Sequence, residues 1–413
     1  MDGELMLFRG LGRPRSSDGF HQDDTFWYLT GIESPDTALI LDGETGREIL
    51  LLPPPDPWRE ARSGHLWDAE DAWVAPLTGF TEITRNDAET NAQLIALVEE
   101  LLGERETLGL ALYPAITMGE SQHRAYAFER QRKMDRLDGR VNRADQLAER
   151  LRQRLDVRIV DLAPALREMR WIKQAPEITA LAEAGRIGAL AIEEAMRSTS
   201  PGVPASHLVA LMNLTQIRAG ADGSAFPPIV QSGRQTTMLA STSDRELVAG
   251  ELVLVEFGSE VDHYASNLTR TWPASGVFST YQAEIYDVVL EAQKAGIAAA
   301  KPGAKLVDVD GAITKVFRSH GLFQLRRHFS CHFVGLEPVD PSHRQPFEPG
   351  VVISIGPGLY DRGRSTGVRI EDLVLITENG ARVLTENVPR ERKEIESRIK
   401  ERGVFDWMEG RRD

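Results

Sequence analysis

The chain has 413 residues, of which 41% are apolar and 27% are charged, and it carries a formal net charge of −14. This length is too great for one average domain and fits two, and the negative charge argues against nucleic acid as the main partner. No apolar run approaches the ~20 residues that a membrane span requires, so we expect no membrane partner either.

The sequence also predicts the compartment in which the chain works. Its start, MDGELMLFRGLGRPRSS, lacks the basic-then-apolar pattern of a signal peptide. Cys331 is the single cysteine, which excludes an internal disulfide and favours a reducing environment. We therefore expect a cytoplasmic protein.

The first part of the chain alternates predicted strands and helices. Short apolar runs bounded by turn residues predict strands at residues 37–42, 47–53, 108–114 and 157–162. Helical stretches are expected near residues 88–102, 121–137 and 143–154. This alternation predicts an α/β domain over residues 1–173.

A second domain is predicted to begin with a long helix. Pro176 suits the first turn of a helix and Glu177 suits the dipole-favoured position behind it, and apolar residues then recur at helical spacing. We place the domain boundary at Gln174 and assign residues 174–413 to the second domain.

The second domain contains an internal repeat. Residues 249–258, AGELVLVEFG, match residues 349–358, PGVVISIGPG, at an offset of 100. Two helix-ending Pro-Gly corners, at Pro201 and Pro302, are 101 residues apart, and another helix follows each of them. Each half is therefore predicted to be helix, corner, helix and β-hairpin. We expect a pseudo-two-fold α+β fold in which both halves contribute strands to one curved sheet, with the helices outside.

The repeat predicts one functional site, where the two hairpins meet at the symmetry centre. Glu256 in the first hairpin matches Gly356 in the second. On the return strands, Asn267 is expected opposite Glu256, and Glu371 is expected opposite Gly356. Four carboxylates at such positions would bind hard metal ions, but only Glu256 and Glu371 carry charge here.

Several segments, in this order along the chain, carry a resemblance to a known family. They are HQDDTFWYLTGIESPDTALIL (21–41), MRWIKQAPEITAL (169–181), FPPIVQSG (226–233), GELVLVEFGSEVDHYASNLTRTWPASG (250–276), CHFVGLEP (331–338), PGVVISIGPGLY (349–360) and GVRIED (367–372). On these segments the chain resembles the pita-bread metallopeptidases aminopeptidase P and prolidase, which are relatives of creatinase. The resemblance implies a creatinase/aminopeptidase P-like α/β N-terminal domain and a pita-bread C-terminal domain, with a start that is shorter than usual by one helix.

The resemblance also implies a two-metal site with five ligands, in the chain order Asp, Asp, His, Glu and Glu. The corresponding positions are Glu256, Asn267, His332, Gly356 and Glu371. His332 and Glu371 retain the family's residues, and Glu256 is a longer carboxylate. Asn267 offers only a neutral amide oxygen, and Gly356 has no side chain.

Charge determines what these losses mean. Two divalent ions about 3.5–4 Å apart repel each other strongly and need anionic ligands. The family's four carboxylates supply a charge of −4 against the +4 of two divalent ions, whereas Glu256 and Glu371 supply a charge of only −2. Because the loss of even an outer hydrogen-bond partner lowers metal affinity by roughly 10–100-fold, we predict no stable two-metal centre.

The proton-handling histidines that the resemblance implies are also missing, since their positions fall on Ala240 and Val339. The remaining candidate catalytic residues are His328, His332 and Arg369. Of these, His328 also fits a purely structural histidine, and His332 could simply form a hydrogen bond to a neighbour in the site.

Three functions remain open. The first, which we favour, is a pseudopeptidase that binds short peptides, including Xaa-Pro peptides, without cutting them. The second is a hydrolase that uses no metal or one weakly bound Zn²⁺ or Mn²⁺, held by Glu256, Asn267, His332 and Glu371 with a water beside Gly356. The third is a protein-interaction module. The resemblance further implies a homodimer or homotetramer.

Overall fold

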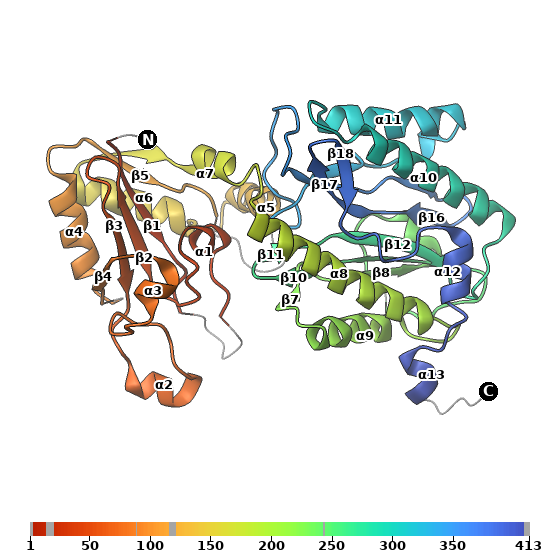
Figure 1. Cartoon of the computed structure of the whole chain (residues 1–413), viewed down its shortest axis with the longest axis horizontal. Coiled ribbons are helices and arrows are strands. Elements are labelled where there is room, and N and C mark those ends of the chain that lie inside the picture. Colours follow the sequence, from red (N-terminus) through yellow and green to blue (C-terminus); the bar gives the residue numbers. More distant parts are fainter. Residues whose placement is uncertain (1–2, 14–19, 88, 115–120, 243, 409–413) are drawn as a thin grey trace. The chain divides into compact units, whose positions relative to one another are not determined.

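The computed structural model describes residues 3–13, 20–87, 89–114, 121–242 and 244–408. Contacts within the chain divide it into two compact units, and the division falls between Met169 and Arg170. Figure 1 draws the first unit in red to yellow and the second in yellow-green to blue. Among the described residues, no helix combines the length and apolar character needed to cross a bilayer.

The first unit is built on a six-stranded sheet with the order β4-β3-β2-β1-β5-β6. The strands are β1 (Leu5–Arg9), β2 (Ala38–Asp42), β3 (Glu48–Leu52), β4 (Glu82–Arg85), β5 (Thr107–Leu110) and β6 (Arg158–Asp161). β1 pairs antiparallel with β2 and parallel with β5, and β2 and β3 form an antiparallel hairpin. Leu5 and Leu7 pack on one face of the sheet, and Met6 and Phe8 pack on the other. Because both faces are covered, the strands β1, β2 and β3 are mainly apolar in sequence.

The helices described in this unit are α1 (Asp24–Thr30), α2 (Pro57–Ser63), α3 (Val74–Thr78), α4 (Ala92–Leu102), α5 (Gln122–Met134), α6 (Arg143–Leu155) and α7 (Ala163–Met169). Of these, α4, α5 and α6 confirm the three helices that the sequence predicts. α4 and α6 bury Leu94, Val98, Ala148 and Leu151 against the sheet, whereas α5 buries none of its residues. The sequence patterns do not predict β1, β4 or the short helices.

The second unit repeats a helix–helix–hairpin pattern twice, as the sequence predicts. The first copy consists of α8 (Ala175–Arg197), α9 (Ala205–Arg218), β7 (Gly223–Ser224), β8 (Ile229–Ser232), the 3₁₀ helix η1 (Gly233–Thr237), β9 (Leu252–Phe257), β10 (Ser259–Val261), β11 (Tyr264–Ala265) and β12 (Leu268–Pro273). The second copy consists of α10 (Thr280–Ala299), α11 (Leu306–Ser319), η2 (Phe323–Leu325), β13 (Cys331–Phe333), β14 (Val352–Ile355), β15 (Gly358–Asp361), β16 (Thr366–Arg369) and β17 (Asp372–Thr377). After it come β18 (Gly380–Val383), α12 (Arg392–Arg398) and α13 (Val404–Met408).

The hydrogen-bond pattern corrects one detail of this prediction, because the two copies do not share one continuous sheet. The strand order is β12-β9-β8 in the first copy and β13-β14-β17-β18 in the second. An isolated bridge joins them, formed by backbone hydrogen bonds of 3.2 and 2.9 Å between Thr269 and Glu371. The second ladder stops at Ile355 because Pro357, two residues further on, has no N–H with which to extend it.

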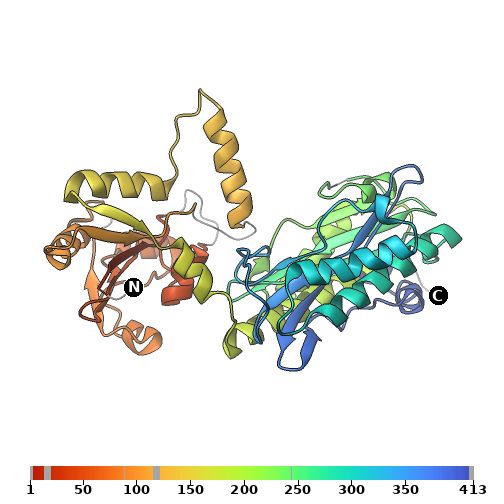
Figure 2. The same cartoon turned by 90° about the horizontal axis from the view of Figure 1, so that it is seen from above.

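The helices α8, α9, α10 and α11 lie outside these strands (Figure 1 and Figure 2), and all four pack on one apolar core. A buried ion pair lies beside that core. Arg270 of β12 donates to Asp372 of β17 at 2.7 Å and to the carbonyl of Pro389 at 2.9 Å. Both side chains of the pair are 0% exposed. Since Arg270 follows Thr269 and Asp372 follows Glu371, this pair holds the two hairpins together at the predicted site.

Candidate functional site

The positions that correspond to the family's metal ligands come together near the bridge between β12 and β17. Glu256 lies in β9 and His332 in β13, while Asn267, Gly356 and Glu371 lie at the ends of β12, β14 and β17. His332 Nε2 is 3.5 Å from Asn267 Nδ2 and 3.4 Å from Glu371 Oε1. The sequence therefore predicted the location of a polar cluster next to the apolar core of the second unit.

The register of the first hairpin differs from the prediction. Glu256 pairs with Thr269, so the expectation that Asn267 lies directly opposite Glu256 is wrong. The short strands β10 and β11 interrupt the hairpin before β12 begins, and the pairing is displaced by two residues as a result. Asn267 and Thr269 share one face because side chains alternate along a strand.

In the second hairpin, Glu371 occupies the space beside Gly356. Ile355 pairs with Asp372, which places Gly356 opposite Glu371 as predicted. A Cβ atom added at Gly356 would lie 2.7 Å from Glu371 Cδ, which is well inside van der Waals contact. A carboxylate side chain at position 356 therefore requires Glu371 to move.

Both carboxylate oxygens of Glu371 accept hydrogen bonds from protein groups. Ser354 Oγ donates to Oε1 at 2.6 Å, and Thr269 Oγ1 donates to Oε2 at 2.7 Å. Burial favours the neutral acid, but the hydrogen bond from His332 and the charge of Arg369 outweigh it and hold the pKa of Glu371 far below its ordinary value. Glu371 is therefore an ionised carboxylate with a hydrogen-bond donor at each oxygen.

His332 contacts both Asn267 and Glu371, as one interpretation of the sequence allowed. Its Nδ1 lies 3.1 Å from the carbonyl of Phe333, which can only accept, so Nδ1 carries a proton and Nε2 faces the site. Burial lowers the pKa of His332, but the hydrogen bond and charge of Glu371 outweigh it and raise the pKa above its ordinary value. Asn267 Oδ1 is buried and has no hydrogen-bond partner among the described residues. The site thus has one unused oxygen acceptor.

Arg369 supplies a positive charge inside the site. Its Nη2 donates to Glu256 Oε2, and its Nε donates to Thr269 Oγ1 at 3.3 Å. Burial opposes the guanidinium charge, but the carboxylate of Glu256 outweighs it and raises the pKa of Arg369. Together with Glu256 and Glu371, the buried guanidinium leaves the cluster with a net charge of −1, apart from any proton on His332.

The third candidate catalytic residue, His328, is bound to Tyr360. Its Nε2 lies 2.8 Å from the hydroxyl of Tyr360, and its Nδ1 lies 2.9 Å from the carbonyl of Phe329. Burial, assisted by the charge of Arg369, lowers the pKa of His328 to about 4. A neutral His328 donates from Nδ1 and accepts the Tyr360 proton at Nε2, and this arrangement fits a structural role.

The positions of the family's two additional histidines carry no proton-transfer group. Ala240 is exposed in the segment after η1, and Val339 is half-buried in a turn after β13. Neither a methyl nor an isopropyl group can donate or accept a proton at these places.

Sequence reasoning missed three residues that complete the cluster: Ser354, Thr269 and Tyr360. The first two could have been found from strand alternation. Ser354 precedes Gly356 by two residues and Thr269 follows Asn267 by two, so each shares a face with a candidate ligand position. Tyr360 lies on a separate pair of strands, β15-β16, and no local pattern connects it to His328.

Comparison with known proteins places the chain among metallopeptidases. Residues 179–378 match the family model of metallopeptidase family M24, and residues 13–100 match that of the aminopeptidase P N-terminal domain. The Xaa-Pro aminopeptidase of Escherichia coli (strain K12) is 30% identical over 438 residues, which cover 95% of this chain and 92% of that protein. Human Xaa-Pro aminopeptidase 3 is 29% identical over 414 residues, which cover 91% of this chain and 76% of that protein.

Solved structures agree with these sequence matches. A putative aminopeptidase P from Bacillus anthracis superposes with a TM-score of 0.84 at 27% identity, covering 98% of this chain and 96% of that one. Aminopeptidase P from E. coli with the inhibitor Pro-Leu superposes with a TM-score of 0.78 at 26% identity, covering 96% and 94%. The chain therefore belongs to the aminopeptidase P family of M24 metallopeptidases. The predicted fold class is confirmed: an α/β N-terminal domain is followed by a pita-bread domain.

Membership of this metallopeptidase family implies the use of metal ions. Within the second unit, no three His, Cys, Asp or Glu side chains among the described residues bring ligand atoms within 4.8 Å of one another. Glu256 faces a guanidinium, and Glu371 accepts from Ser354 and Thr269. A cluster of net charge −1 does not fit two divalent ions, whose charge is +4.

Proposed function

We propose that the chain is a member of the aminopeptidase P family that binds short peptides, Xaa-Pro peptides among them, without a dinuclear metal centre and without peptidase activity. The observation that carries the proposal is the pairing of Glu256 with Arg369 in the place where the family's first metal ligand would lie. Arg369 is an arginine that the family resemblance also implies, so the cluster differs from the family's pattern in its two missing carboxylates, at Asn267 and Gly356.

Repulsion between the two ions is the energetic obstacle to a dinuclear centre. Two unit charges 4 Å apart interact by about 4 kcal/mol at an effective dielectric constant of about 20, so two divalent ions repel by about 16 kcal/mol. Anionic ligands must offset this, and Arg369 already neutralises one of the two carboxylates. Ordinary metal-activated hydrolysis would also lack the two histidines, because Ala240 and Val339 stand at their positions.

The cluster suits the α-ammonium group of a peptide. Its net charge of −1 matches one ammonium, and the unused Asn267 Oδ1 is an acceptor for one of that group's three N–H donors. The side chains of Glu256 and His332 retain 17% and 27% exposure, so the cluster reaches solvent. Relatives named Xaa-Pro aminopeptidases, and an E. coli structure that holds Pro-Leu, favour short proline peptides as ligands.

Calorimetric titration with Ala-Pro-Ala tests the proposal. We expect saturable binding that is equal in EDTA and in Mn²⁺, and no release of the N-terminal alanine in either buffer. The N-acetylated peptide, which lacks the ammonium group, should bind at least about tenfold more weakly, since a hydrogen-bonded charge contributes about 1.5–3 kcal/mol. Cleavage in Mn²⁺ at ordinary metallopeptidase rates, or binding that needs Mn²⁺, contradicts the proposal.

A single-metal hydrolase is the second candidate, and the unpartnered Asn267 Oδ1 favours it. This oxygen lies on the same side chain that approaches His332 Nε2, and the two atoms are acceptable ligands for one Zn²⁺ or Mn²⁺. Glu256 and Glu371 would have to exchange their present partners to complete the coordination. Cleavage that saturates at one bound ion per chain would favour this candidate.

We further propose a cytoplasmic homodimer or homotetramer. The free, buried Cys331 suits a reducing compartment, and the assembly is an expectation from the family. Light scattering on the purified chain distinguishes these assemblies from a monomer.

A further inference from the structure

A cavity in the first unit lies at the carboxyl ends of two parallel strands. It has a volume of about 70 Å³, and its lining includes apolar side chains such as Leu7, Phe26 and Leu110 and three charged residues, Arg9, Arg143 and Asp23. Arg9 is the last residue of β1 and Leu110 is the last residue of β5, which pairs with β1 in parallel. Ligands of open α/β sheets commonly bind at this edge.

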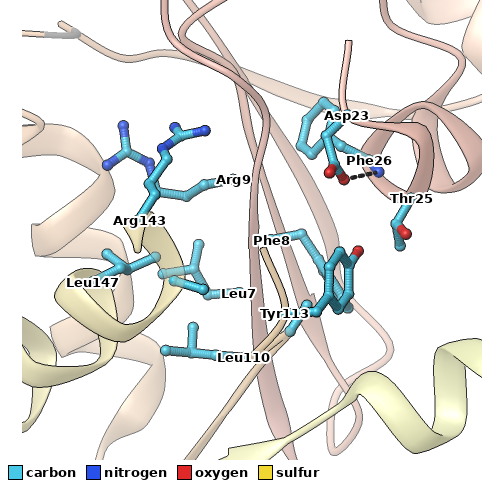
Figure 3. Close-up of a pocket in the computed structure, with 12 residues that line it drawn as sticks. Leu7, Phe8, Arg9, Asp23, Thr25, Phe26, Leu110, Tyr113, Arg143 and Leu147 are labelled. Carbon is cyan, nitrogen blue, oxygen red and sulfur yellow. Dashed lines mark hydrogen bonds between the residues drawn. The ribbon is translucent and has the colours of Figure 1, made fainter. Parts of the chain in front are cut away.

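The two arginines, Arg9 and Arg143, lie next to each other on one side of β1 (Figure 3). Arg9 Nη2 donates to Asn91 Oδ1 at 3.1 Å, and Arg143 Nη2 donates to the carbonyl of Gly10 at 2.5 Å. Both acceptors are neutral. The Nε of Arg9 is buried and has no hydrogen-bond partner among the described residues.

The carboxylates of Asp23 and Asp36 offset only part of the positive charge of this pair. Asp36 forms its ion pair with Arg13 at 2.6 Å, and Asp23 accepts the N–H of Phe26 at the start of α1. Neither Arg9 nor Arg143 forms an ion pair with a carboxylate of the described residues. Burial lowers the pKa of both arginines, and the charge of Arg143 lowers that of Arg9 further. Two neighbouring guanidinium charges that the nearby carboxylates offset only in part favour the binding of an anion in this cavity.

The helix α6 adds to the positive electrostatic potential around the two arginines, because Arg143 is its first residue. The amino end of a helix carries a partial positive charge, which favours anions near its first turn.

We propose that this cavity binds one small oxyanion, a carboxylate or a phosphate, between the guanidinium groups of Arg9 and Arg143. Planar guanidinium groups recognise both anions through paired N–H donors. One water molecule needs about 10–15 Å³ of such accessible volume, so a cavity of about 70 Å³ has room for a single oxyanion group.

Calorimetric titration of the full chain at constant ionic strength tests the proposal, with inorganic phosphate in one arm and acetate in the other. We expect one saturable site per chain in at least one arm. The variants Arg9→Gln and Arg143→Gln should each weaken that binding at least about tenfold, because each removes a charged donor. Saturation by phosphate alone indicates a phosphate group, and saturation by acetate indicates a carboxylate.

Two further variants keep the test decisive. Arg47→Gln removes an exposed arginine of the same unit, paired with Glu82, and should change binding less than twofold. Arg9→Lys keeps the positive charge and should retain more affinity than Arg9→Gln, which a purely structural role would not predict. Absence of saturable binding of both anions by the wild-type chain overturns the proposal, as does binding that neither Arg9→Gln nor Arg143→Gln weakens.

Discussion

The Asn267→Asp/Gly356→Glu double variant should bind Mn²⁺ at least about 100-fold more tightly than the wild-type chain. The two substitutions add two carboxylates and change the net charge of the cluster from −1 to −3. The loss of an outer hydrogen-bond partner alone lowers metal affinity by roughly 10–100-fold, so restoring two direct ligands should have at least that effect. Fluorescence-monitored or calorimetric titration with Mn²⁺ measures the change.

The Gly356→Gln variant is the matched control for this experiment. A glutamine at position 356 meets the same obstacle as a glutamate, because the Cβ atom of either would lie 2.7 Å from Glu371 Cδ. It adds no charge, so its Mn²⁺ affinity should stay close to that of the wild-type chain. If Gly356→Gln and the Asn267→Asp/Gly356→Glu double variant gain the same affinity for Mn²⁺, the shortage of negative charge does not exclude the ions. That result would contradict the loss of the metal centre.

Replacement of Arg270 by methionine should lower the free energy of unfolding by about 3–5 kcal/mol, which is the usual effect of breaking a buried ion pair from one side. Arg270 is 0% exposed and donates to Asp372 and to the carbonyls of Thr269, Glu371 and Pro389. The substitution leaves the Asp372 carboxylate buried, with hydrogen bonds from Gln293 and Thr385 and with Arg390 Nη1 3.6 Å away. Urea unfolding of the full chain measures the loss.

Arg392→Met provides a comparison of the same chemistry at the surface. Arg392 also donates twice to an aspartate, Asp287, at 2.6 and 2.7 Å, but these side chains are 32% and 52% exposed. Exposed pairs contribute about 0–1 kcal/mol, so this variant should remain near the stability of the wild-type chain. If Arg270→Met and Arg392→Met lower the free energy of unfolding equally, the buried Arg270–Asp372 pair does not stabilise the contact between the hairpins more than a surface pair would.

The architecture of the second unit could be predicted from the sequence because a repeat makes one pattern appear twice. α9 and α11 begin at residues 205 and 306, and β9 and β14 begin at residues 252 and 352. These spacings of 101 and 100 residues agree with the offsets between the Pro-Gly corners and between the hairpin motifs. Periodicity and turn residues are local properties, and they identify elements without knowledge of the fold.

The contacts inside the site could not be predicted in the same way. Arg369 and Glu256 are separated by 113 residues, and no local pattern shows that the guanidinium pairs with this carboxylate. The pairing partner of Glu256 was missed for a related reason. The strands β10 and β11 displace the return strand, so that Glu256 pairs with Thr269 and not with Asn267, and turn residues alone do not specify this displacement.

The first unit was harder to predict because its strands are buried on both faces. β1 consists of four apolar residues followed by Arg9, and such a short run has no alternation to distinguish it from other buried segments. The pair of Arg9 and Arg143 depends on the parallel pairing of β1 with β5 and on the position of α6. Neither can be inferred from the residues around either arginine.

The most direct test of the missing metal centre is anomalous diffraction from crystals soaked in Mn²⁺. We predict that no pair of manganese peaks lies among Glu256, Asn267, His332 and Glu371, and that any density there is a single ion of partial occupancy. Two fully occupied peaks about 3.5–4 Å apart between the hairpins β9–β12 and β14–β17 would contradict the account, because a cluster of net charge −1 would then have held a charge of +4.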